Sequence, residues 1–198
     1  MARREEHLHG DEPERCDVAL LLVDVINPLD FGEADRLLKL ALPMADRLAE
    51  LKRRAAAAGV PVIYANDNFG RWRSDLHALI ERCVQVGVKG RAIVEKLPLG
   101  PDDYFVLKPM HSAFYCTTME VLLRSTGAKT LVMGGIAANI CVLFSANDAY
   151  MRDYRLVIPR DGVASNTAEL NDAALDQMRL VLKADVRPAA EVDFAELK

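Results

Sequence analysis

An almost unbroken apolar run, VALLLVDV at residues 18–25, constrains the fold of this chain more than any other feature. A run of this kind, without polar alternation, is typical of a central strand in a parallel sheet that helices cover on both faces. Asp24 interrupts the run, and an unpaired carboxylate at a buried position would cost several kcal/mol. The run therefore predicts a buried strand, and Asp24 predicts a cationic partner near its end.

Short apolar runs alternate with helix-like patterns along the rest of the chain. Further strands are predicted at residues 60–65, 104–107, 130–133, 155–158 and 185–187, and helices at 34–58, 75–86, 117–126, 139–151 and 168–183, with Pro43 a candidate kink or break in the first helix. This alternation predicts an α/β fold with three layers (α/β/α), a Rossmann-like open sheet of about six mainly parallel strands. We expect residues 1–198 to form a single domain in which about 1–15 and 190–198 are peripheral.

The composition narrows the class of protein. A chain of 198 residues that is 51% hydrophobic is long enough for one domain with a sizeable core. The net charge of -4 and the absence of a long Lys/Arg block argue against nucleic acid as a partner. No signal-peptide core follows the N-terminus, and no apolar run approaches membrane-spanning length. We therefore expect a cytoplasmic protein with no membrane partner.

The four cysteines are Cys16, Cys83, Cys116 and Cys141, and their spacing suggests neither a disulfide framework nor a CxxC metal site. Cys141 stands apart because it follows an apolar strand and a Gly-Gly turn, at the start of a predicted helix. There the helix dipole and free backbone N–H groups would lower the thiol pKa and could hold an oxyanion. The alternative is that Cys141 is a small buried hydrophobe, as most free cysteines are.

Reactive side chains follow three of the predicted strands. Ligands of open parallel sheets bind beyond the carboxyl ends of the strands, where Asp24, Lys108 and Cys141 would meet. Lys108 is the obvious partner for Asp24, and Pro109 restricts it to the extended backbone of a strand end. The alternative is a purely structural buried ion pair.

Three ordered motifs resemble the isochorismatase-like cysteine hydrolases, which include nicotinamidases and N-carbamoylsarcosine amidase. The resemblance covers residues 18–167, through ALLLVDVINP at 19–28, KPMHSAF at 108–114 and VMGGIAANICV at 132–142. It implies a catalytic triad of Asp24, Lys108 and Cys141 and, because relatives commonly form dimers or tetramers, a homodimer or homotetramer. The partner it implies is a small-molecule substrate.

The resemblance also implies a mechanism. The Cys141 thiolate would attack an amide or ureido carbonyl, with Asp24 as general base and acid and Lys108 supporting the charge. Asp24 would then activate the water that hydrolyses the thioester. The backbone N–H groups of Ala137 and Cys141 would form the oxyanion hole, with a cis peptide bond between Ile136 and Ala137.

Departures from the family pattern narrow the expected activity. The turn carries Ala138 and Asn139 where many relatives have Thr-Asp or Thr-Asn. No histidine lies in residues 66–75, where nicotinamidases hold a metal. His77 with Asp67 would make only a weak metal site. We therefore expect no metal or other cofactor. Cleavage of a vinyl ether, as in true isochorismatases, needs acid catalysis more than a thiol. That activity and a non-catalytic scaffold of the same fold are the alternatives to amide hydrolysis.

The substrate pocket is inferred from position alone. Its expected walls combine aromatic and amide side chains: Asn27, Phe31, Asn66, Trp72, Phe114 and Phe144, each of which could instead pack in the core. Arg71 and Arg73 are candidates to bind a substrate carboxylate, with surface solvation as the alternative. His111 is an alternative base in a Cys-His dyad. Cys116 lacks a glycine turn and is expected to be structural.

Overall fold

A parallel sheet forms the centre of the computed structural model, which describes residues 13, 15–73 and 75–198. Within those residues the strands are β1 Val18–Val23, β2 Val62–Asp67, β3 Tyr104–Lys108, β4 Thr130–Ile136, β5 Arg155–Val157 and β6 Val163–Ala164. Their order is β3-β2-β1-β4-β5, β6 pairs with β4, and every pairing is parallel. The predicted open sheet is confirmed, and β1 lies at its centre.

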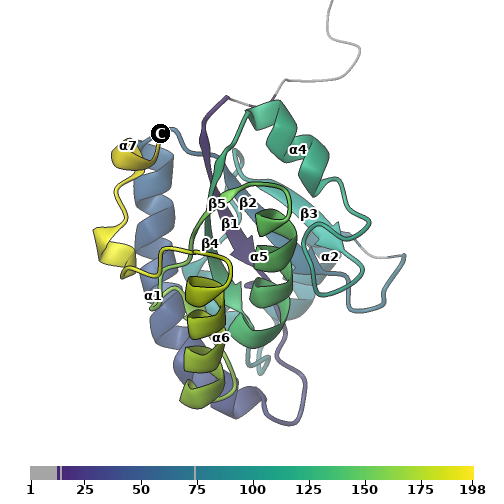
Figure 1. Ribbon diagram of the computed structural model, residues 1–198. Coiled ribbons are helices and arrows are strands. Elements are labelled where there is room, and N and C mark those ends of the chain that lie inside the picture. The colour runs from purple at the N-terminus through teal and green to yellow at the C-terminus, as the bar shows by residue number, and fades with distance from the viewer. Residues whose placement is uncertain (1–12, 14, 74) are drawn as a thin grey trace, which may run out of the picture.

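Helices cover both faces of the sheet. They are α1 Ala34–Ala57, α2 Leu76–Cys83, α3 Arg91–Lys96, α4 Met119–Thr126, α5 Leu143–Tyr150, α6 Ala168–Leu180 and α7 Phe194–Leu197. Successive β1 side chains face opposite layers, as expected for a strand. Leu20 and Leu22 pack in the core with α1, α2, α3 and α7. Leu21 packs on the other side with α4, α5 and α6. Figure 1 shows α5 and α6 in front of the sheet and α1 behind it. The three predicted layers are therefore present.

Local sequence signals explain most helix boundaries. Asp75 caps α2, with its Oδ1 accepting a hydrogen bond of 2.9 Å from the backbone N–H of Ala78. Gly127 ends α4 with a left-handed φ of 76°. Pro43 neither ends nor breaks α1, which is continuous from Ala34 to Ala57.

Several elements differ from the sequence-based expectation. The short strand expected at 185–187 is wrong, since Asp185 contributes only an isolated bridge to Val157. The sixth strand is β6, which has only two residues and is too short for periodicity to reveal. The expectation of a peripheral C-terminal end is also wrong, because Phe194 and Leu197 are buried in the core beside α1. Of the N-terminal segment expected to be peripheral, residues 1–12 and 14 lie outside the described residues.

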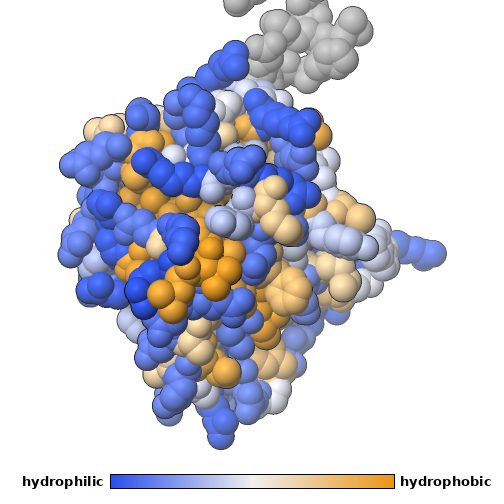
Figure 2. Space-filling view, in the orientation of Figure 1, coloured by the Kyte–Doolittle hydropathy of each residue, from blue (hydrophilic) through white to orange (hydrophobic). Residues whose placement is uncertain are grey.

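The outer surface is mostly polar on the face shown in Figure 2. Hydrophobic side chains gather there around the C-terminal end of α6, where Leu180 and Val181 are exposed. None of the helices in the described part of the chain combines the length and the apolar character that crossing a membrane requires. The oligomeric state expected from the resemblance stays a prediction.

Candidate active site

A buried ion pair lies at the carboxyl edge of the sheet. Asp24 follows β1 with a left-handed φ of 52°, and its Oδ2 lies 2.8 Å from Nζ of Lys108, the last residue of β3. Asp24 is 3% exposed and Lys108 is 0% exposed. The cationic partner predicted for Asp24 is therefore present, delivered from the edge strand across β2.

Asp67, the last residue of β2, completes this charged cluster. Its backbone N–H donates a hydrogen bond of 2.7 Å to Asp24 Oδ1, and its Oδ2 lies 3.6 Å from Lys108 Nζ. Lys108 Nζ also donates to the carbonyl oxygen of Met110 at 3.3 Å. Both oxygens of the Asp24 carboxylate are thus oriented by fixed partners, which is the arrangement that makes a buried charge tolerable.

Burial and charge set the protonation of the pair. Burial raises the pKa of Asp24. This rise is opposed but not cancelled by Lys108, the Cys141 thiol and the Asp67 N–H. Burial alone would lower the pKa of Lys108, but attraction to Asp24, Cys141 and Asp67 outweighs it and raises that pKa. Lys108 therefore stays cationic, whereas Asp24 is a stronger base than an exposed carboxylate.

The turn after β4 brings Cys141 to the same edge. Gly135 has a φ of 126°, and a Cβ at this position would lie 2.0 Å from the carbonyl oxygen of Val23, so only glycine fits here. The peptide bond between Ile136 and Ala137 is cis, as the resemblance implies. Cys141 then lies in a turn of π-helix, Ala138–Val142, that leads into α5, whereas the sequence predicted an α-helix from residue 139.

The Cys141 thiol is half-buried, and its pKa responds to the charges of both Asp24 and Lys108. Burial raises its pKa, the Asp24 charge raises it further, and Lys108 opposes the rise. The predicted lowering of this pKa by the helix start is therefore wrong for the resting site, because burial and Asp24 outweigh it. The thiol therefore starts protonated in the resting site.

His111 is an exposed residue beside the sulfur. Its Nδ1 is 3.8 Å from Cys141 Sγ, and its ring packs against Phe144 with 5.4 Å between centroids. Ser145 lies in the segment that resembles the family, but the sequence predicts no role for it. Its Oγ accepts from the Ala113 N–H at 2.9 Å and donates to the Cys141 carbonyl at 2.7 Å. No local pattern marks this serine, because its two partners come from different parts of the chain.

The proposed pocket residues divide into two groups, of which the first is structural. Asn27 Oδ1 accepts from the Leu29 N–H at 2.9 Å, and buried Asn66 donates to the Ile26 carbonyl at 2.8 Å, so both amides hold the loop after β1. Phe114 is only 5% exposed and packs against Tyr154. Its ring lies in the core on the side of α4, α5 and α6, and a role for Phe114 as a pocket wall stays a prediction.

The second group is exposed. Phe31 and Phe144 are about half exposed, and Trp72 is 79% exposed, so its ring extends into solvent rather than enclosing a site. Cys116 is exposed on the loop before α4. Phe144 therefore lies near the thiol, because its ring packs against His111. Among the interactions of the described residues, none joins Phe31 or Trp72 to Asp24, Lys108 or Cys141.

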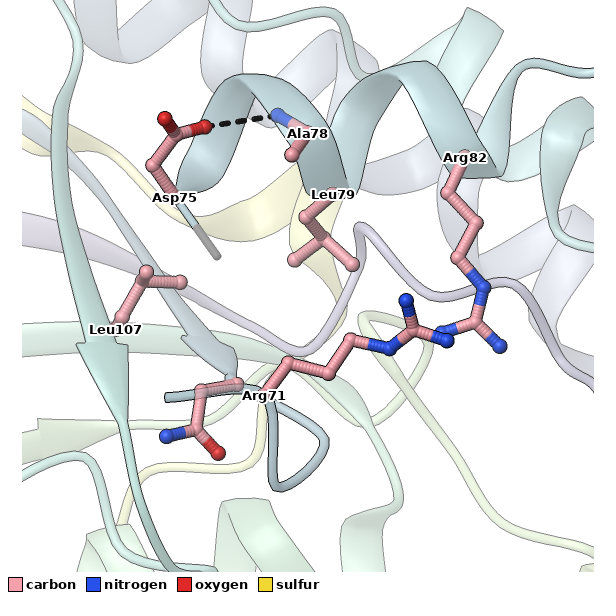
Figure 3. Close-up of a pocket in the computed structure, with 7 residues that line it drawn as sticks. Arg71, Asp75, Ala78, Leu79, Arg82 and Leu107 are labelled. Carbon is pink, nitrogen blue, oxygen red and sulfur yellow. Dashed lines mark hydrogen bonds between the residues drawn. The ribbon is translucent and has the colours of Figure 1, made fainter. Parts of the chain in front are cut away.

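Arg71 lies in a separate small cavity of about 70 Å³, lined by Asn68, Arg71, Asp75, Ala78, Leu79, Arg82 and Leu107. Figure 3 shows the Arg71 and Arg82 side chains extending toward one another along this cavity. Arg82 forms an ion pair with Asp30, and Arg73 is exposed. Because no triad residue lines the cavity, a role for Arg71 or Arg73 in binding a substrate carboxylate stays a prediction.

The charged cluster suits proton transfer better than metal binding. Asp67 Oδ1 accepts from the Phe69 N–H at 2.6 Å, and its Oδ2 faces the Lys108 ammonium. Within the described residues, no group of three or more His, Cys, Asp or Glu side chains is placed to hold a metal ion. Asp67 thus serves the Asp24–Lys108 pair, and the absence of a cofactor stays an expectation.

An open parallel α/β sheet whose carboxyl edge gathers a carboxylate, an ammonium and a thiol defines a hydrolase of the isochorismatase-like class. The Isochorismatase domain profile matches residues 18–191, and the chain belongs to the isochorismatase family. The chain is 39% identical over 178 residues to the uncharacterised isochorismatase family protein YaaI of Bacillus subtilis, covering 90% of this chain and 97% of that protein.

Two further relatives are amidohydrolases by name. Ureidoacrylate amidohydrolase RutB of Methylorubrum extorquens is 29% identical over 139 residues, which cover 60% of this chain and 56% of that protein. The crystal structure of N-carbamoylsarcosine amidase from Thermoplasma acidophilum is similar with a TM-score of 0.64 and 26% identity, covering 90% of this chain and 99% of that one. The chain is therefore an isochorismatase-family hydrolase with amidohydrolase relatives.

Proposed function

We propose that this protein hydrolyses a C–N bond, amide or ureido, of a small molecule through a thioester on Cys141. The observation that carries the proposal is the buried Asp24–Lys108 pair, 2.8 Å from Oδ2 to Nζ, which lies near enough to Cys141 for both charges to shift the pKa of the thiol. A purely structural ion pair would not need a thiol among its partners. The names of RutB and N-carbamoylsarcosine amidase support a substrate with an amide or ureido group.

Acylation begins with proton transfer from Cys141 to Asp24. The raised pKa of Asp24 makes the carboxylate a capable base, and Lys108 stabilises the thiolate that forms. The thiolate attacks the carbonyl carbon to give a tetrahedral oxyanion. Asp24 then returns the proton to the leaving nitrogen, the C–N bond breaks, and the acyl group remains on sulfur.

The oxyanion forms next to the turn after β4. We assign its stabilisation to the backbone N–H groups of Ala137, which precedes the π-helical turn, and of Cys141, which lies within it. Backbone donors need no particular side chain, so Ala138 and Asn139 in the turn are compatible with this role. Hydrolysis of the thioester then releases the acid and regenerates the thiol.

A substrate screen with matched variants tests the proposal. Ureido acids, including ureidoacrylate and N-carbamoylsarcosine, simple primary amides, nicotinamide and isochorismate are incubated with the enzyme, and released ammonia and product masses are measured. We expect ammonia from at least one amide or ureido compound, complete loss of turnover in Cys141→Ala, and normal turnover in Cys116→Ala, in which an exposed cysteine is removed. Turnover of isochorismate alone, or full activity in Cys141→Ala, would contradict the proposal.

A further inference from the structure

We propose that His111 is the general base of the second half of the reaction, in which it activates the water that hydrolyses the Cys141 thioester. The inference rests on the proposed function, because it concerns the fate of the acyl-enzyme. It separates the work of two bases, so that Asp24 serves acylation from the buried side of the sulfur and His111 serves deacylation from the exposed side.

The position of the imidazole fits this step. His111 Nδ1 lies 3.8 Å from Cys141 Sγ, and the histidine is exposed to solvent. The carbonyl carbon of an acyl group on Sγ would lie one covalent bond from the sulfur, so a water hydrogen-bonded to Nδ1 can come within about 3–3.5 Å of that carbon. His111 therefore touches a reacting atom and has access to bulk water.

Asp24 is less suited to this step. One carboxylate oxygen accepts from the Asp67 N–H, the other faces Lys108, and the side chain is almost fully buried. Asp24 is 3% exposed whereas His111 is exposed, so bulk water reaches the imidazole directly.

The loop that carries His111 is fixed to the nucleophile. Ser145 of α5 accepts from the Ala113 N–H and donates to the Cys141 carbonyl, which joins the loop and the π-helical turn through one hydroxyl. Ser112 Oγ also bonds to the Asp148 carboxylate of α5. Both bridges lie directly after His111 in the chain, and the Lys108 ammonium donates to the carbonyl of Met110 directly before it, so the loop around the histidine is fixed on both sides.

The chemical step balances without any other reactant. His111 Nδ1 accepts a proton from water as the water oxygen bonds to the thioester carbonyl carbon. The tetrahedral intermediate collapses, the C–S bond breaks, and the sulfur leaves as a thiolate. The imidazolium returns the proton to the sulfur, so the acid product and the free thiol are formed.

Burst kinetics with p-nitrophenyl acetate test the assignment. His111→Phe keeps a ring against Phe144 but removes both nitrogens, and His77→Phe alters an exposed histidine of α2 as the matched control. We expect His111→Phe to retain a burst of about one p-nitrophenolate per Cys141, while its steady-state rate falls about 10²–10⁴-fold. An acetyl group should then accumulate on Cys141. Hydroxylamine, which attacks without a base, should restore turnover as acetohydroxamate, and His77→Phe should behave as wild type.

Three results would speak against the inference. An unchanged steady-state rate in His111→Phe, without accumulated acetyl-enzyme, would overturn it. Loss of the burst in folded His111→Phe, with the same result in His111→Gln, would assign the histidine to acylation instead. If the wild-type enzyme forms no adduct on Cys141 at all, the thioester function itself fails, which is a different outcome from the first two.

Discussion

Replacing Lys108 by methionine should destabilise the protein strongly, because it leaves Asp24 as an uncompensated buried charge. Lys108 is fully buried and lies 2.8 Å from Asp24 Oδ2. Removing one partner of such a pair costs about 3–5 kcal/mol of unfolding free energy. For a domain of this size, that loss corresponds to a fall in Tm of roughly 6–20 °C. Urea denaturation followed by circular dichroism measures the change.

The double variant identifies the origin of the loss. Asp24→Asn combined with Lys108→Met removes both charges, so it should be more stable than Lys108→Met alone. The deficit of Lys108→Met should also shrink on acidification. Burial raises the pKa of Asp24 above its ordinary value of 3.8, and without Lys108 less opposes that rise, so the folded state binds the proton more tightly than the unfolded state. Stability relative to wild type is therefore regained as pH falls toward 3.8.

Two results would refute this reasoning. If Lys108→Met unfolds within about 1 kcal/mol of wild type, the pair is not the uncompensated-charge system described here. If the double variant loses the sum of the two single losses, Asp24 and Lys108 are not coupled. Either outcome would also weaken the assignment of Asp24 as a base whose protonation Lys108 controls.

Three further predictions concern the thiol, the turn and metals. Asp24→Asn should abolish turnover yet speed alkylation of Cys141 by iodoacetamide at pH 8. The Asp24 charge raises the pKa of the thiol and Lys108 lowers it, so removing the Asp24 charge leaves more thiolate. Slower alkylation would contradict this assignment of charges. Gly135→Ala should cost about 2 kcal/mol or more of unfolding free energy, since the new Cβ would collide with the backbone of Val23. Gly32→Ala should be nearly neutral, because no atom lies within 4 Å of the Cβ built at that position. Equal urea midpoints for the two variants would contradict this prediction. Dialysis against EDTA should leave turnover unchanged, because Asp67 faces Lys108; zinc-restored activity would contradict this.

Much of the fold could be predicted from strand patterns. The run at 18–25 revealed β1, because a central strand buried on both faces has no polar alternation, and Gly127 marked the end of α4. Elements that depend on tertiary contacts could not be predicted. The two residues of β6 form a strand because β4 lies beside them, and Phe194 is buried because it joins the core cluster that also contains α1 residues.

The triad residues could be placed from the sequence because strand ends of a parallel sheet share one edge, and Asp24 was conspicuous within an apolar run. The direction in which the pKa of Cys141 shifts could not be predicted. It depends on burial and on the charge of Asp24, and the start of a helix reveals neither. Phe114 and Trp72 were assigned by proximity in sequence. One ring is in the core and the other is in solvent, because position beside a strand end does not fix the direction of a side chain.

The most direct test of the central claim is mass spectrometry of the wild-type enzyme, quenched in acid during turnover of an amide or ureido substrate. We expect an acyl group of the substrate's mass on the peptide that contains Cys141, which disappears when substrate is exhausted and is absent in Cys141→Ala. Full turnover with no acyl group on Cys141 at any time, and with equal activity in Cys141→Ala, would contradict a thioester mechanism.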